Sequence, residues 1–129
     1  MRREGWERRL FELIEARRSE PFAWGRNDCL TFALEGFEAV RGVKALELPG
    51  SYKTEVGAAR LLKRLGHASL EAAATSALGK PLSSVLLAQR GDIAFLDGLM
   101  VVAGKEAVGP GANGLEARPL ADLKMVWRL

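Results

Sequence analysis

The feature that most constrains the fold is a change in the hydrophobic pattern close to Gly91. Before this residue, apolar side chains recur at the three- and four-residue spacing of amphipathic helices, and after it short apolar runs are separated by turn residues, as in strands. Helices followed by strands are the order of an α+β domain. The sequence therefore predicts an α+β fold, with a helical part over residues 4–80 packed on an antiparallel sheet over residues 91–129.

The helical part divides into four segments at residues that favour helix ends. Short polar side chains that can accept a hydrogen bond from a first-turn N–H precede three of the segments, and glycines follow them. The first expected helix covers about residues 4–18. The second follows an N-cap at Asn27 or Asp28 and stops at Gly42, the third follows Thr54 and stops at Gly66, and the fourth follows Ser69 and finishes at Gly79 and Pro81. Pro21 and the aromatic residues after it connect the first two helices.

The sheet part opens with a predicted hairpin. The apolar runs IAFL and LMVVA flank Asp97-Gly98, and two residues of this type between such runs predict a tight two-residue turn. Further short strands are expected at residues 106–108, 115–117 and 125–129. The segment GPGANG between two of them is expected to be a plain loop, because it lacks the Lys and Ser/Thr that end a phosphate-binding loop.

Length and charge limit the classes of function. The chain has 129 residues, which is the size of one domain, and we expect a single domain over 1–129. Its net charge is only +3, and the arginines of the first 18 residues alternate with glutamates, so nucleic acid is not expected as a partner. No apolar run has the length of a membrane span or a signal peptide, so the expected location is the cytoplasm as synthesised.

Cys29 is the only cysteine, and it follows Asn27-Asp28 at the expected start of the second helix. A helix N-terminus favours the thiolate, and its free N–H groups can stabilise an oxyanion. A lone cysteine is also often a small buried apolar residue. Cys29 is thus a candidate nucleophile or a packing residue, and with His67 alone it cannot form a zinc site, so neither a metal nor a cofactor is expected.

A cysteine nucleophile normally needs a base within hydrogen-bond reach. The only histidine is His67, which we expect to be an exposed turn residue between two helices. Asp28 adjoins the thiol but raises its pKa instead of lowering it. Asp92, at the head of the first strand, fits a turn better than a catalytic carboxylate, so the sequence offers Cys29 no evident partner.

Three segments together resemble the NlpC/P60 group of papain-like cysteine peptidases. PFAWGRNDCLTFALEGF, which contains Trp24, looks like the aromatic loop, Asp-Cys and helix of that group, and RGDIAFLDG is similar to its first Gly-Asp strand. The closing segment LEARPLADLKMVWRL is similar to a small phage and prophage family of unknown function within the group.

The resemblance implies a papain-like fold with Cys29 in the nucleophile position. In active members a histidine begins the second strand, but here that place falls on Gly98 or Leu99. The third, orienting residue would fall near Glu106 or Ala107, which do not match it. Catalytic triads act as a unit, so losing the base removes several orders of magnitude of rate.

These observations lead to three hypotheses of function. The first is a phage- or prophage-encoded NlpC/P60-like domain that is catalytically impaired and serves as a tail-assembly or tail-tip accessory protein, with phage tail proteins or peptidoglycan peptides as partners. The second is an active cysteine peptidase or amidase that cleaves cell-wall peptides with Cys29 as nucleophile. The third is a cytoplasmic protein-interaction domain in which Cys29 is structural. The expected site residues are Cys29, Trp24, Asn27, Asp28, Gly98 and Leu99.

Overall fold

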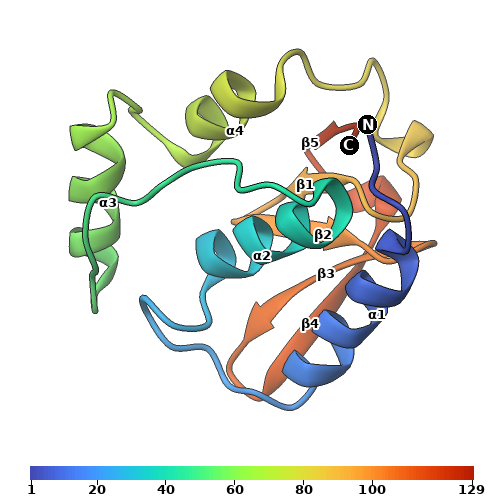
Figure 1. Cartoon of the computed structure of the whole chain (residues 1–129), viewed down its shortest axis with the longest axis horizontal. Coiled ribbons are helices and arrows are strands. Elements are labelled where there is room, and N and C mark those ends of the chain that lie inside the picture. Colours follow the sequence, from blue (N-terminus) through green and yellow to red (C-terminus); the bar gives the residue numbers. More distant parts are fainter.

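Four helices precede a five-stranded antiparallel sheet in the computed structural model, which describes residues 1–129 (Figure 1). The helices are α1 (Trp6–Arg17), α2 (Cys29–Arg41), α3 (Glu55–Arg64) and α4 (Leu70–Leu78). The strands are β1 (Ile93–Phe95), β2 (Leu99–Val102), β3 (Glu106–Gly111), β4 (Gly114–Pro119) and β5 (Met125–Trp127), and two short 3-10 helices are η1 (Val85–Leu87) and η2 (Leu120–Asp122). The predicted α+β class is confirmed.

The predicted helix ends are largely confirmed, because the local hydrogen bonds form as expected. The side chains of Asp28, Thr54 and Ser69 each accept a hydrogen bond from a backbone N–H of the first turn of α2, α3 and α4. α1 differs, since it is preceded by Gly5 with no side-chain cap. These caps determine where α2 begins, and therefore where Cys29 lies.

The strand order in the sheet is β4-β3-β2-β1-β5, with every neighbouring pair antiparallel. β2 lies in the centre, while β5 returns from the end of the chain to pair with β1 at one edge. The loop between β1 and β2 thus joins the central strand to its neighbour, and its residue Gly98 lies against Cys29 at the start of α2.

The predicted two-residue turn between the first two strands is wrong. The last residue pair of β1 and β2 is Phe95 with Leu99, so the loop has three residues, Leu96, Asp97 and Gly98. Phe95 and Leu99 belong to the main core, whereas Leu96 packs against the cluster on the other face of the sheet. A two-residue turn would make Leu96 and Leu99 a cross-strand pair. The two side chains of such a pair point to the same face of the sheet, whereas Leu96 and Leu99 lie on opposite faces, so this turn is excluded.

The predicted GPGANG loop is also wrong in part. β3 continues through Gly109, Pro110 and Gly111, and β4 begins at Gly114, so only Ala112 and Asn113 remain as a turn. Glycine and proline weaken the expectation of a strand. Pairing with β4 along the whole of β3 overrides that local preference, which a sequence pattern cannot reveal.

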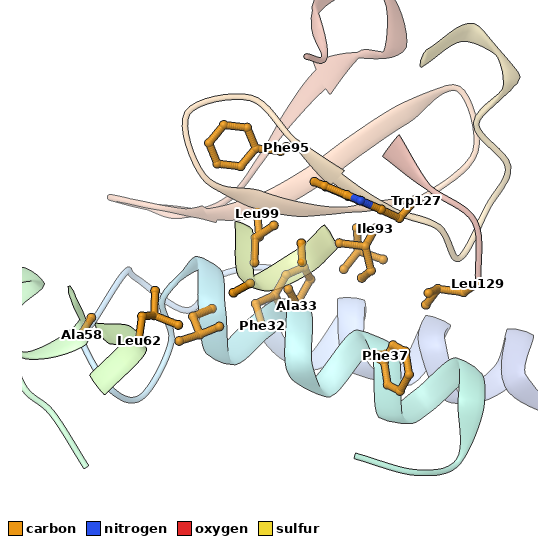
Figure 2. Close-up of a cluster of buried hydrophobic side chains, with 14 of the residues drawn as sticks. Phe32, Ala33, Phe37, Ala58, Leu62, Ile93, Phe95, Leu99, Trp127 and Leu129 are labelled. Atoms are coloured by element: carbon orange, nitrogen blue, oxygen red, sulfur yellow. The ribbon is translucent and has the colours of Figure 1, made fainter. Parts of the chain in front are cut away.

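The main hydrophobic core lies between α2 and one face of the sheet. In Figure 2, Phe32 and Ala33 of α2 face Ile93, Leu99 and Trp127 of the sheet, and all five side chains are buried. A smaller cluster on the opposite face contains Ala94, Met100, Val102, Ala107, Leu123 and Val126. α2 is therefore held firmly against the central strand, with its N-terminus pointing at the β1-β2 loop.

Asp92, the possible catalytic carboxylate of the Gly-Asp strand, instead joins the two ends of the chain. Its buried carboxylate accepts hydrogen bonds from Arg2 Nη2 at 2.9 Å, Arg128 Nε at 3.0 Å and the backbone N–H groups of Gln89 at 2.8 Å and Leu129 at 3.1 Å. The two termini accordingly lie side by side in Figure 1. Asp92 therefore has a structural role, and none of its hydrogen bonds involves Cys29.

None of the four helices combines the length and the apolar character needed to cross a lipid bilayer.

Candidate functional site

Cys29 is the first residue of α2 and is half-buried at its N-terminus. The residue before it, Asp28, is the N-cap and is completely buried. Asp28 Oδ1 accepts a hydrogen bond from Thr31 N at 2.8 Å, while Thr31 Oγ1 accepts one from Asp28 N at 2.9 Å, which together form a capping box. The position of the thiol is thus determined by the cap.

Asn27 and Asp28 also secure the aromatic connector before the helix. Asp28 Oδ2 accepts a hydrogen bond from Gly25 N at 2.7 Å. Asn27 donates through Nδ2 to the carbonyls of Glu20 and Pro21, both at 3.1 Å, and accepts from Arg17 Nη1 at 3.1 Å. Asn27 is therefore a buried structural residue that faces the connector, and it makes no contact with the thiol through these bonds.

The connector places Trp24 beside Cys29. Trp24 packs edge-on against Phe22, with ring centroids 4.8 Å apart, and lines the same cleft as the thiol. Gly25 has a left-handed backbone, and a Cβ there would lie 1.9 Å from the carbonyl oxygen of Tyr52. Only glycine permits this approach, which brings the segment before α3 against the start of α2.

Gly98 lies directly against the thiol. A Cβ added at Gly98 would be 3.1 Å from Sγ and 3.2 Å from Cβ of Cys29, closer than ordinary van der Waals contact. Gly98 does not have a left-handed backbone, so the turn itself does not require glycine. The close approach of Cys29 is the physical reason for a residue without a side chain at this place.

Leu99 contributes its backbone to the site, while its side chain belongs to the core. The Leu99 backbone N–H acts to lower the pKa of the Cys29 thiol. The Leu99 side chain is buried and packs toward α2 (Figure 2). The two residues at which the resemblance places the catalytic histidine, Gly98 and Leu99, thus offer the thiol one N–H group and no base.

The third position suggested by the resemblance, near Glu106 or Ala107, lies away from the thiol. β2 and β3 pair Val101 with Val108 and Val102 with Ala107, so the start of β3 lies at the far end of β2 from Gly98. Ala107 belongs to the cluster on the face turned away from α2. The residues of β3 that line the cleft beside Cys29 are Gly109 and Pro110, which carry no titratable group.

Burial raises the pKa of the Cys29 thiol above its ordinary value, and the neighbouring Asp28 carboxylate raises that pKa further. The backbone N–H groups of Leu99, Leu30 and Cys29 act in the opposite direction but do not reverse the shift. Burial and the charge of Asp28 therefore outweigh the neighbouring N–H groups in their effect on the pKa of the Cys29 thiol.

Tyr52, which the sequence analysis did not single out, lies close to the site. Its side chain is 7% exposed, and its hydroxyl makes no hydrogen bond of normal geometry. Burial and the nearby carboxylate of Asp28 raise its pKa, with a smaller contribution from Cys29. No local pattern marks this tyrosine, because it reaches Asp28 only through the long segment between α2 and α3.

Two clefts meet at Cys29 and the neighbouring Asp97. The larger has a volume of about 270 Å³ and lies between the start of α2, the α3 helix and the turn before α4. The smaller, of about 110 Å³, lies between the β1-β2 loop and strands β3 and β4, and Glu116 and Arg118 line it. Neither cleft is lined by His67, although the three residues that follow it line the larger one.

No group of three or more His, Cys, Asp or Glu side chains is placed to hold a metal ion. The chemistry available at the site consists of a neutral thiol, backbone N–H groups at the start of α2 and on Leu99, and the carboxylates that line the clefts.

A family model matches the whole chain, residues 1–129, and its description is a domain of unknown function, DUF6950. Neither a curated protein nor a solved structure matches the chain.

Proposed function

The chain belongs to the DUF6950 family, and we propose from the geometry of its site that it is a papain-like domain, related to the NlpC/P60 peptidases, that binds a peptide without hydrolysing it. The resemblance further suggests a phage or phage-like particle as its setting, with a role in tail assembly or in a tail-tip complex. In this proposal Cys29 is a residue of the binding cleft.

One observation carries the proposal. Gly98 is so close to Cys29 that a Cβ added to it would lie 3.1 Å from the sulfur. The resemblance expects a histidine imidazole at this position. A thiol whose pKa is raised is mostly protonated near neutrality and is a poor nucleophile without a base. The arrangement supports a scaffold that retains the nucleophile position and lacks the group that would activate it.

The two clefts support peptide binding. They share Cys29 and Asp97 as lining residues, so an extended ligand that crosses the thiol would contact both. Ligand sites in proteins are commonly concave, mainly apolar and provided with a few polar groups, which describes the larger cleft.

The test compares the protein with its Cys29→Ala variant. Both are incubated with peptides released from bacterial cell walls, and products are followed by mass spectrometry over time. We expect no cleavage above the level of Cys29→Ala, and alkylation by iodoacetamide that rises only above pH about 8.5, the ordinary pKa of a thiol. Cleavage that depends on Cys29, together with alkylation at neutral pH, would contradict the proposal.

A second candidate is the active cysteine peptidase or amidase. The observation in its favour is that Cys29 is the first residue of α2, where backbone N–H groups without a partner in the helix can stabilise a developing oxyanion. The same cleavage assay separates the two functions.

A further inference from the structure

The larger cleft beside Cys29 has a mainly apolar wall. Six side chains form most of it: Trp24, Leu30, Ala58, Ala59, Leu62 and Leu70. They come from the aromatic connector, α2, α3 and the start of α4, and the close approach of Gly25 to Tyr52 brings the connector against the segment that precedes α3. A ligand that fills this cleft of about 270 Å³ must therefore present an aliphatic or aromatic group to it.

The charged groups of this cleft are both acidic. Glu55, in the first turn of α3, and Asp97, in the β1-β2 loop, are the only charged residues in its lining. Both are exposed, and neither takes part in a salt bridge or a side-chain hydrogen bond. The chain as a whole carries a net charge of +3, so the sign of the cleft is opposite to that of the protein.

We propose that this cleft takes a lysine-type side chain of a bound peptide, with its aliphatic stem against the apolar wall and its ammonium group next to Glu55 and Asp97. A lysine stem packs along apolar surface while its charged end stays near water, and this matches an apolar wall with exposed carboxylates. Trp24 adds an aromatic face that attracts a cation. The inference rests on the proposed function, because it requires that the peptide is held and not cleaved.

Because Asp97 lines both clefts, the path of the bound peptide from one cleft to the other can be inferred. Asp97 and Cys29 line both clefts, so a peptide whose lysine lies in the larger cleft continues across the thiol toward Glu116 and Arg118. The thiol then lies beneath the peptide backbone next to the lysine. This explains how Cys29 can belong to a binding site without acting as a nucleophile.

The experiment titrates the isotope-labelled protein with acetyl-Gly-Ala-Lys-Ala-Gly-amide and follows backbone amide shifts by NMR. The same peptide with norleucine keeps the aliphatic stem and removes the charge. We expect the lysine peptide to shift the amides of Cys29, Ala58 and Asp97. The norleucine peptide should bind more weakly by more than about fivefold, because it loses the interaction with both carboxylates and each is worth about that factor.

The variants Glu55→Gln and Asp97→Asn should each weaken lysine-peptide binding by a similar factor of about five. Their matched controls are Glu71→Gln, which removes the corresponding first-turn carboxylate of α4, and Asp122→Asn, an exposed aspartate in η2. Neither control residue lines the cleft, so both should leave the affinity unchanged.

Equal binding of the lysine and norleucine peptides, or no amide shifts at millimolar peptide, would overturn the inference. So would an equal loss of affinity in the controls. The failure of the proposed function looks different, because it would appear as time-dependent peptide cleavage that Cys29→Ala abolishes.

Discussion

Gly98 and Cys29 are in such close contact that a single added carbon at Gly98 would lie 3.1 Å from the sulfur of Cys29. We expect Gly98→Ala to lower the free energy of unfolding by about 1 to 3 kcal/mol, the usual cost of overpacking. In the Cys29→Ala background the loss should be smaller, because the sulfur is gone and only the contact with Cβ remains.

Urea unfolding of the four proteins of this double-mutant cycle measures the effect. Gly50→Ala is the control, since its added Cβ would lie 4.0 Å from the nearest neighbouring atom and its backbone is not left-handed. A Gly98→Ala penalty that is the same with and without Cys29, or that Gly50→Ala reproduces, would show that the sulfur does not cause it.

The raised pKa of Cys29 predicts a loss of stability at alkaline pH. In the unfolded chain the thiol titrates near pH 8.5, and in the folded protein it titrates higher, so the folded state holds the proton more tightly. The associated stabilisation is fully present below about pH 8.5 and decreases as the pH rises through the folded-state pKa.

Thermal or urea unfolding between pH 7 and pH 9.5 checks this prediction on the protein and on Cys29→Ala. The variant should lose this part of the pH dependence. Tyr52→Phe is the comparison, because the pKa of Tyr52 is raised as well and its contribution has the same sign but begins only near pH 10, the ordinary pKa of tyrosine. An unfolding free energy that is equally pH-dependent in Cys29→Ala would contradict the assignment.

Replacing Asp28 by Asn should make the thiol more acidic. Asparagine caps a helix about as well as aspartate, so its one carbonyl oxygen keeps the bond from Thr31 N, while the bond from Gly25 N is lost. The negative charge that helps to raise the pKa of Cys29 is removed. We expect the midpoint of the iodoacetamide reactivity profile to move to lower pH in Asp28→Asn than in the unchanged protein.

The control for this experiment is Thr31→Ala, which removes half of the capping box without changing the charge beside the thiol. Circular dichroism of both variants verifies that the helices persist. A midpoint that stays in place or moves upward in Asp28→Asn would show that the carboxylate does not oppose thiolate formation.

Asp92→Asn should destabilise the protein strongly, by about 3 kcal/mol or more, because removing one partner of a buried charge cluster leaves the others unsatisfied. Arg2, Arg128 and the N–H groups of Gln89 and Leu129 all depend on this carboxylate. Urea unfolding measures the loss.

Arg8→Ala is the matched control for charge removal. It breaks the exposed pair of Arg8 with Glu12, and such a surface pair contributes less than about 1 kcal/mol. If the two variants lost similar stability, Asp92 would not be the structural centre that joins the termini.

Much of the helical part could be predicted from the sequence because its determinants are local. Asp28, Thr54 and Ser69 cap the helices through N–H groups three residues away, and such bonds require no distant partner. The strands were harder, since the length of β3 and the three-residue loop before β2 depend on which residues pair across the sheet. For the site, the sequence pointed to Cys29 itself, while the resemblance pointed to Gly98 or Leu99 and to a third position near Glu106 or Ala107. The register of β2 and β3 places that third position far from Gly98, and such a register depends on distant pairing.

The sequence by itself determined the starts of α2, α3 and α4, the order of helices and strands and the position of the thiol at a capped N-terminus. Each of these follows from hydrogen bonds or hydrophobic periods within a few residues. Only the tertiary structure decided what surrounds that thiol. Burial, the contact with Gly98 and the proximity of Tyr52 arise between segments distant along the chain. Their geometry depends on strand register and on packing between α2 and the sheet, which no local pattern records.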